Sequence, residues 1–253
     1  MNLFFITAAA VGISSVAGTA FGVLVRKIPH KYNDLILGCA SGIMLAAAIV
    51  GLILPAMETE GKFSLPMTIV GVLTGAALVS ILDRITPHLH KLAGLDQEEH
   101  KNNQGTGKVL LFISAIAIHK LPEGLAAGVS FGTGNTGDVL TVTGSIALQN
   151  IPEAMVIVAP LLAIGVTIRR TLLISVGIGI ISILGMGIGY GLISITKVLM
   201  PFFLAFAGGT MLYVISDEMI PETHSHGFEK QATFSMIGGF LLVLILQKIL
   251  ENA

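Results

Sequence analysis

The sequence predicts an all-α, polytopic membrane protein with eight transmembrane helices. Hydrophobic residues make up 53% of the 253-residue chain and charged residues only 11%, whereas a soluble domain has about 25% charged residues. Apolar stretches of about 20 residues, the length that crosses a bilayer as a helix, recur along the whole chain. They form a single transmembrane domain over 1–253 and lie at 3–25, 33–56, 65–86, 108–131, 138–166, 170–194, 199–221 and 232–250.

The first span begins close to the N-terminus, where Met-Asn-Leu-Phe-Phe lacks the basic residues of a cleaved signal peptide. We therefore expect it to remain as a span. Most connectors between spans are short, but segment 86–108, between the third and fourth spans, is rich in His, Asp, Glu, Asn and Gly and predicts a polar cytoplasmic loop. Its histidines, His88, His90 and His100, either bind metal transiently or belong to a plain polar connector.

Basic residues predict the orientation of the spans, because the cytoplasmic loops of membrane proteins have an excess of Lys and Arg. With the N-terminus outside, only Lys62, Lys197 and Lys248 fall on the outer side. The inner loops then contain Arg26, Lys27, Lys31, Arg84, Lys91, Lys101, Lys108, Arg169, Arg170 and Lys230. We expect a multi-pass protein of the cell membrane, surrounded by the lipid bilayer, with both termini extracytoplasmic. A formal net charge of -1 gives no indication of nucleic-acid binding.

Two similar strings lie in the fourth and fifth spans, thirty residues apart. The first is His119-Lys120-Leu121-Pro122-Glu123-Gly124 and the second is Gln149-Asn150-Ile151-Pro152-Glu153-Ala154. In each string a polar residue precedes a glutamate by four positions, about one helical turn, so the two side chains share a helix face. Because the two spans run antiparallel, the repeat in the chain becomes an inverted repeat near the membrane midplane, where many transporters bind their substrate.

A proline stands directly before each glutamate. Proline removes one backbone donor and displaces the carbonyl four residues earlier, so Pro122 and Pro152 are expected to kink their helices beside the polar pair. Freed carbonyl groups and a wider helix suit a hydrated ion. Single prolines are often structural, but a matched pair beside two glutamates favours a site. A weaker similarity of the same kind links 54–58 with 220–222, at the ends of the second and seventh spans.

The side chains of the two strings form a candidate metal site. One imidazole, one amide and two carboxylates come from His119, Gln149, Glu123 and Glu153. This mixture suits a divalent transition metal such as Zn²⁺, with Fe²⁺, Mn²⁺ and Cd²⁺ as alternatives. An ionisable group at membrane depth costs about 3 kcal/mol or more, and two carboxylates would neutralise a dication. Met44, in the second span, either adds a thioether ligand or packs in the core.

The paired strings resemble those of the ZIP (Zrt/Irt-like) family of divalent metal importers. His-x-x-Pro-Glu-Gly on a fourth span and Asn-Ile-Pro-Glu on a fifth are similar to the family motif, and the eight spans, the outward termini and the His-bearing loop fit it over essentially the whole chain. The string Ser216-Asp217-Glu218-Met219-Ile220-Pro221-Glu222 resembles the bacterial, GufA-type branch.

The resemblance implies a transporter and not an enzyme, with a transported metal and no prosthetic group. It implies that His119, Glu123, Gln149 and Glu153 form the principal site, with Met44 as a further ligand. It also implies an elevator-like motion of spans 1, 4, 5 and 6 against spans 2, 3, 7 and 8, often in a homodimer.

The sequence departs from the family pattern at the position of a second metal. Several relatives bind a second ion with Asn or Asp just after the first ligand of each string and with a Glu on the sixth span. Here those string positions are Lys120 and Asn150, and 175–190 in the sixth span has no acidic residue. We therefore predict one metal ion, with the ammonium of Lys120 in the place of the second cation. The alternative is that Lys120 turns aside and snorkels.

A further polar group lies at the predicted inner end of the seventh span. Its members are Asp217, Glu218, Glu222, His224 and His226. They form either an exit route for the metal or a solvated helix end. The family resemblance favours Glu218, with Asp217, as a ligand on the exit route.

Other functions stay open beside metal import. An intramembrane metal-dependent hydrolase would hold a catalytic metal with His119 and Glu123, but the His-Glu-x-x-His string of many zinc proteases is absent from the sequence. A metal-gated channel or a scaffold is a further class, although nothing resembles a repeated pore filter. The physiological metal and proton coupling are not determined by these residues.

Overall fold

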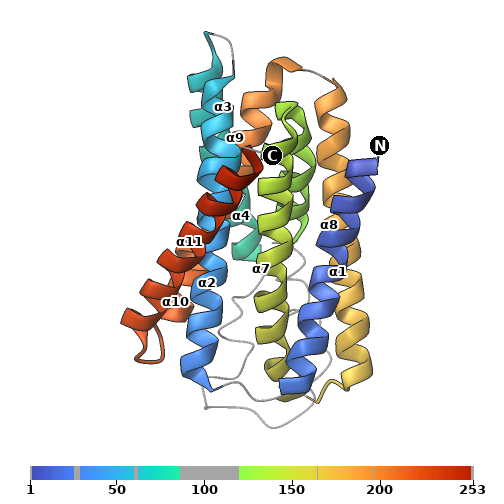
Figure 1. Ribbon diagram of the computed structural model, residues 1–253, viewed down its shortest axis with the longest axis vertical. Helices are drawn as coiled ribbons and strands as arrows, with labels where there is room; N and C mark the ends of the chain where they lie inside the picture. The colour runs from blue at the N-terminus through green and yellow to red at the C-terminus, as the bar shows by residue number, and fades with distance from the viewer. Residues whose placement is uncertain are drawn as a thin grey trace.

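The computed structural model describes residues 2–25, 29–59, 62–85, 120–163, 165–195 and 197–251. These residues form helices and no strand, which confirms the predicted all-α fold. Seven helical stretches among them are long and apolar enough to cross a membrane. Both termini lie in the upper half of the molecule, as expected for an even number of spans (Figure 1).

The helices follow the predicted spans closely, and two of the spans continue through a π-helical turn into a short helix. The long helices are α1 (Asn2–Val25), α2 (His30–Ala48), α4 (Ser64–Ile85), α7 (Thr136–Ala163), α8 (Ile168–Ile195), α9 (Met200–Val214) and α11 (Glu229–Glu251). The continuations are η1 (Ile49–Ile53) with α3 (Leu54–Glu58), and η4 (Ile215–Met219) with α10 (Ile220–Thr223). The 3-10 turns are η2 (Ser130–Thr133) and η3 (Lys197–Leu199). Residues 120–129 are helical and are the described part of the fourth span.

Both π-helical turns lie directly ahead of a proline. Pro55 is the second residue of α3, and Pro221 is the second residue of α10. Because proline donates no backbone hydrogen bond, a widened turn before it accommodates the break in the ladder. The weak similarity between the ends of the second and seventh spans thus corresponds to a shared backbone feature. The α7 helix instead passes through Pro152 as one α-helix; the inverted repeat and the kinks in the fourth and fifth spans stay predictions.

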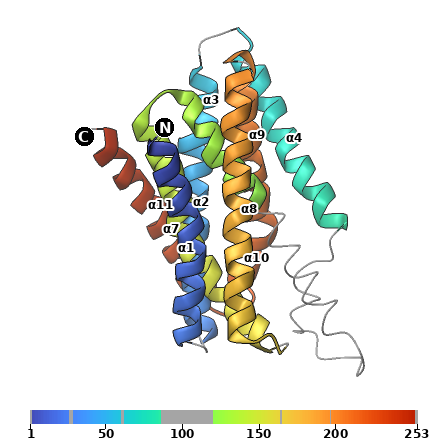
Figure 2. The same cartoon turned by 90° about the vertical axis from the view of Figure 1, so that its right-hand side faces the viewer.

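The helices pack in two groups. In the first bundle, α1 packs against α7 and α8, and the 120–129 helix packs against α8. In the second bundle, α2 packs against α11 and α4 packs against α9. Figure 1 shows α1 and α8 on one side of the molecule and α2 and α11 on the other, and Figure 2 shows α4 beside α9. The bundles meet mainly where α2 and α11 contact α7.

Glycines bring helix backbones into direct contact within each bundle. In the first bundle, a side chain at Gly128 would overlap the carbonyl oxygen of Met186 in α8. In the second bundle, a side chain at Gly42 would overlap the carbonyl oxygen of Met236 in α11. Small residues at such positions are the usual way in which membrane helices approach closely. Among the described glycines, each one whose added Cβ would overlap backbone atoms does so against a helix of its own bundle.

Contacts between the bundles are of a different kind. A side chain at Gly51 of η1 would meet Cγ2 of Val142 in α7, and one at Gly144 of α7 would only reach Cδ2 of Leu246 in α11. The bundles therefore touch through apolar side chains, which can rearrange more easily than interlocked backbones.

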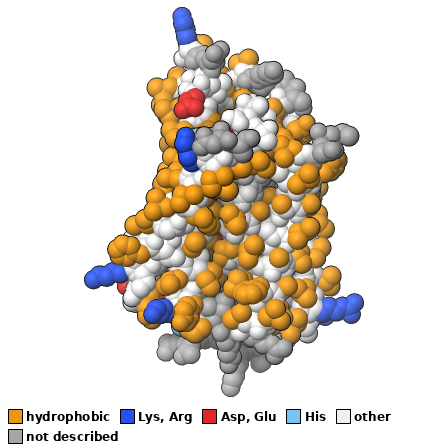
Figure 3. Space-filling view, in the orientation of Figure 1, with side chains coloured by type: hydrophobic (Ala, Val, Ile, Leu, Met, Phe, Trp, Pro, Cys, Tyr) orange, Lys and Arg blue, Asp and Glu red, His pale blue; other side chains and the backbone are white. Residues whose placement is uncertain are grey.

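The outer surface is apolar. Large hydrophobic side chains on several helices are more than half exposed, among them Phe5, Ile13, Leu184 and Phe234. Figure 3 shows hydrophobic side chains across the middle of one face, with Lys and Arg side chains away from it. Such a surface fits burial in lipid, because soluble monomers rarely expose extended apolar patches to water.

Candidate metal centre

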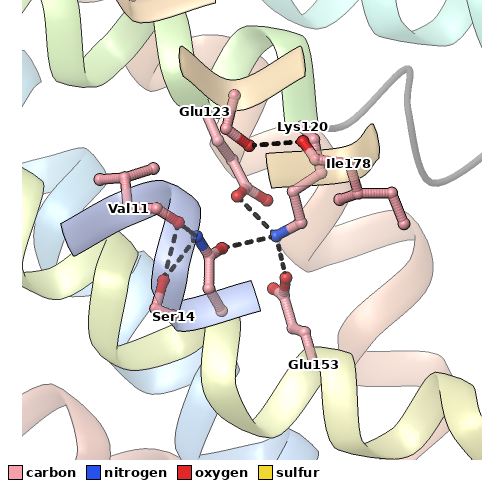
Figure 4. A network of polar contacts seen from close by, with 8 residues as sticks. Val11, Ser14, Lys120, Glu123, Glu153 and Ile178 are labelled. Atoms are coloured by element: carbon pink, nitrogen blue, oxygen red, sulfur yellow. Dashed lines mark hydrogen bonds and ion pairs between the residues drawn. The ribbon is translucent and has the colours of Figure 1, made fainter. Parts of the chain in front are cut away.

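The ammonium group of Lys120 connects the two strings. Its Nζ donates to Oε2 of Glu123 at 2.7 Å and to Oδ1 of Asn150 at 2.8 Å, and it also forms an ion pair with Oε2 of Glu153 (Figure 4). Lys120 is 4% exposed and Glu123 is 2% exposed. One cationic and two anionic groups therefore meet in a part of the molecule that is shielded from its surroundings.

The spacing within each string explains this convergence. Lys120 and Glu123 are three residues apart on one helix, and Asn150 and Glu153 are three residues apart on α7, so each pair lies on one helix face. The two helices present these faces to each other (Figure 4). A repeat in the sequence becomes a single polar cluster in space.

The amide of Asn150 also ties the cluster to α1. Its Nδ2 donates to the carbonyl oxygen of Val11 at 3.2 Å and to Oγ of Ser14 at 3.3 Å. The hydroxyl of Ser14 in turn donates to the Val11 carbonyl at 2.8 Å. Sequence reasoning missed these partners; the only signal was a pair of serines, Ser14 and Ser15, inside an apolar span.

Gln149 directly precedes Asn150 in the sequence, and its side chain is fully buried. Neither Oε1 nor Nε2 of Gln149 has a hydrogen-bond partner among the described residues. A buried polar group without a partner costs about 1–3 kcal/mol, and an ion or a water beside it removes that cost. The amide oxygen of Gln149 is thus suited to bind a cation. His119 lies outside the described residues, as do His88, His90 and His100 of the 86–108 loop.

The charges at the cluster fit one dication better than two. The Lys120 ammonium and the Glu123 and Glu153 carboxylates sum to one negative charge, which one dication reverses to one positive charge. A second dication would leave three positive charges in a shielded site, where unbalanced charge is costly. Across the described part of the chain, no three His, Cys, Asp or Glu side chains gather as a metal cluster.

Met44 is buried in α2. It is 1% exposed and belongs to the same large apolar cluster as Ala126 of the 120–129 helix and Ile146 of α7. Met44 is therefore part of the apolar core that α2 shares with both helices that bear the strings.

The polar group at the end of the seventh span lies on η4, on α10 and in the turn that follows. Asp217 is exposed, while Glu218 and Glu222 are half-buried. The Nδ1 atom of His224 lies 2.7 Å from the carbonyl oxygen of Ile220, a contact within its own helix end. These side chains do not form a metal cluster among the described residues.

His226 instead meets two residues of α2. Its Nδ1 lies 3.0 Å from Oδ1 of Asp34, and its ring stacks on that of His30 with a centroid separation of 4.5 Å. Asp34 is fully buried. Sequence reasoning missed this contact, although His30 and Asp34 are four residues apart, the same spacing that drew attention to the two strings.

A helical membrane protein in which paired proline-glutamate strings surround buried ionisable groups has the features of an ion carrier. A family model described as ZIP Zinc transporter matches residues 86–247. The chain therefore belongs to the ZIP family, as the motif resemblance predicted.

Relatives over nearly the whole chain support this assignment. The chain is 35% identical over 247 residues to zinc transporter GufA of Myxococcus xanthus, which covers 92% of this chain and 95% of the relative. It is 36% identical over 251 residues to zinc transporter ZIPB of Bordetella bronchiseptica, with coverage of 93% and 78% respectively. It is also 26% identical to human zinc transporter ZIP11, with 92% of each chain covered.

Proposed function

We propose that this protein imports a divalent transition metal, foremost Zn²⁺, into the cytoplasm through a single site between the fourth and fifth spans. The ligands are His119, Glu123, Gln149 and Glu153, with Met44 as a further ligand. The observation that supports this most strongly is that Glu123 and Glu153, from two helices, reach the same buried ammonium group, with the Glu153 side chain 14% exposed. The zinc transporters among the relatives make Zn²⁺ the first substrate to test.

Metal binding at this site is a competition for the two carboxylates. Carboxylate, imidazole and amide groups suit Zn²⁺ and related dications. The ion shares Glu123 and Glu153 with the ammonium of Lys120, so binding is weaker than at a structural zinc site. Weak binding suits a carrier, since the ion must leave on the other side.

Lys120 takes the role that a second cation has in several relatives. When the transported ion leaves, the ammonium remains between Glu123 and Glu153 and prevents two anions from facing each other unbalanced. Asn150 positions it, because Oδ1 accepts from Nζ while Nδ2 is held by α1.

The packing supports an elevator-like motion. The first bundle contains the fourth and fifth spans with all the described ligands except Met44, and its helices are joined backbone to backbone at glycines. Its contacts with the second bundle are made by side chains such as Val142. Sliding of one packed unit past another is easiest across such an interface. We therefore infer that α1, the 120–129 helix, α7 and α8 move together against the second bundle, which forms the contact in a homodimer.

On the inner side, Glu218 and Asp217 receive the ion, with Glu222, His224 and His226 farther along the exit route. An intramembrane hydrolase is less well supported, because a catalytic metal needs an open position and a free base, and both glutamates of the strings are paired with Lys120.

The test is Zn²⁺ uptake by the purified full-length protein in lipid vesicles that contain a zinc-sensitive dye. We expect saturable uptake by the wild type and none by Glu123→Gln. The matched control is Glu229→Gln, since Glu229 is an exposed carboxylate in the first turn of α11. Uptake that does not saturate, or that Glu123→Gln retains, would contradict the proposal.

A further inference from the structure

A row of polar residues runs along α7 toward the site. Thr141, Ser145, Gln149 and Glu153 follow one another at intervals of four residues. Residues four apart form a ridge on a helix surface, and each step along it is about 6 Å. The first three are fully buried, and none of their side-chain polar atoms has a hydrogen-bond partner among the described residues.

The hydroxyls of Thr141 and Ser145 differ from most other buried hydroxyls of the described residues, although Oγ of Ser15 also lacks a partner. A Ser or Thr in a helix usually bonds to a carbonyl three or four residues earlier. Thr143, two residues from Thr141 and equally shielded, donates to the carbonyl of Val139 at 2.6 Å. Ser130 donates to Ala127 at 2.8 Å. Thr141 and Ser145 do not make this local bond, so their hydroxyl groups keep their hydrogen-bonding capacity for something else.

The ridge begins at the end of α7 that the basic residues place outside. Thr141 lies in the second turn of α7, which starts at Thr136 after the connector at the outer side. Beside the ridge, Val142 and Ile146 belong to the apolar cluster that α7 shares with Met44 of α2. A line of neutral oxygen atoms thus runs beside Val142, which lies against Gly51 of the second bundle.

We propose that Thr141 and Ser145 form a hydroxyl track that conducts the metal ion, with part of its hydration water, from the outer surface to Gln149. The proposal rests on the transport function proposed above. A dication that loses water needs replacement oxygen atoms at each step, and hard oxygen ligands provide them. Neutral hydroxyls bind it too weakly to retain it, so they affect the rate of passage and not the affinity of the site. Because the track is buried here, the bundles must part along α7 for an ion to pass.

Replacement of the hydroxyls tests the track directly. Thr141→Val and Ser145→Ala should each lower the initial rate of Zn²⁺ uptake about threefold to tenfold, as expected for the loss of one hydrogen-bond-like interaction at the barrier. Equilibrium Zn²⁺ binding to the detergent-solubilised variants should stay within about twofold of the wild type. The matched controls are Thr143→Val and Ser130→Ala, whose hydroxyls bond to their own helices, and both should transport at the wild-type rate.

Thiol labelling measures whether position 145 is accessible from the outside, a property that does not depend on the uptake rate. In a Cys39→Ala background, which removes the lone cysteine of the sequence, Ser145→Cys should react with a membrane-impermeant thiol reagent added outside. Zn²⁺ should slow that reaction, and Thr143→Cys should remain unreactive.

Each outcome decides the proposal. Wild-type uptake by the Thr141→Val/Ser145→Ala double variant, equal losses in the controls, or equal labelling at 143 and 145 would overturn it. If Glu123→Gln still abolishes uptake in the same vesicles, the transport function stands while the track fails. If the wild type shows no uptake, both fail together.

Discussion

The two bundles bury different kinds of side chain. The first bundle buries a lysine, a glutamate and two side-chain amides, namely Lys120, Glu123, Gln149 and Asn150. The second bundle buries mostly apolar residues, and its shielded hydroxyls, such as Ser41 and Thr210, bond to carbonyls of their own helices. Asp34 is its buried carboxylate, and it is paired with His226 near a helix end.

This difference agrees with the division of roles that we propose. A bundle that contains nearly all the proposed polar ligands could move without separating them, whereas a largely apolar partner offers a surface with few hydrogen bonds to break. The glycines agree, since every described glycine whose added Cβ would overlap backbone atoms of another helix does so within its own bundle. Paired substitutions, most of them with one member in each bundle, test this difference.

The largest effect is expected at a carboxylate of the first bundle. Glu153→Gln removes a ligand and one of the two anions around Lys120, so Zn²⁺ uptake should fall at least about a hundredfold, beyond the usual cost of changing a residue that only supports a ligand. Glu58→Gln, at an exposed carboxylate of α3 in the second bundle, should retain uptake. Vesicle uptake rates measure both, and equal losses would contradict the division of roles.

Glycine substitutions should reveal which interfaces are locked. Gly128→Ala in the first bundle and Gly42→Ala in the second place a methyl group against a carbonyl oxygen, and each should lower the free energy of unfolding by about 1–3 kcal/mol. Gly177→Ala, where the added methyl has open space, should not lower it. Reversible unfolding in mixed detergent provides the measurement. Equal destabilisation by all three would show that contact with the neighbouring backbone is irrelevant.

Lys120→Asn should change the number of bound ions. With the ammonium replaced by an amide, the site has one positive charge fewer, so a second dication would leave two positive charges instead of three, and bound Zn²⁺ should rise from about one toward two per chain. The uptake rate should change by about tenfold in either direction, since release depends on the balance of charge at the site. Metal analysis after gel filtration measures the ratio. A ratio and a rate that stay at wild-type values would argue against the cation role of Lys120.

The smallest effect is expected at the link to α1. Ser14→Ala removes one of the two acceptors of the Asn150 amide and leaves the Val11 carbonyl, so it should cost about 1 kcal/mol of stability. Ser41→Ala, in the second bundle, removes a hydroxyl that bonds only within its helix and should cost less. The same unfolding assay compares them, and the reverse order would show that the link to α1 does not stabilise the first bundle.

Much of the fold and of the site could be predicted from local patterns. Apolar length gave the spans, and the four-residue spacing of His119 with Glu123 and of Gln149 with Glu153 predicted that each pair shares a helix face. Local patterns cannot predict which side chains from distant parts of the sequence bond to each other, because these contacts depend on how the helices pack. Asn150 bonds to Ser14 across 136 positions, and His226 meets Asp34 across 192.

Cadmium sites located by anomalous diffraction from crystals of the full chain would test the central claim most directly. The account predicts one strong peak per chain at coordination distance from Glu123, Gln149 and Glu153, with Nζ of Lys120 still beside the two carboxylates. Two peaks bridged by those carboxylates, or a single peak away from Gln149, would contradict it.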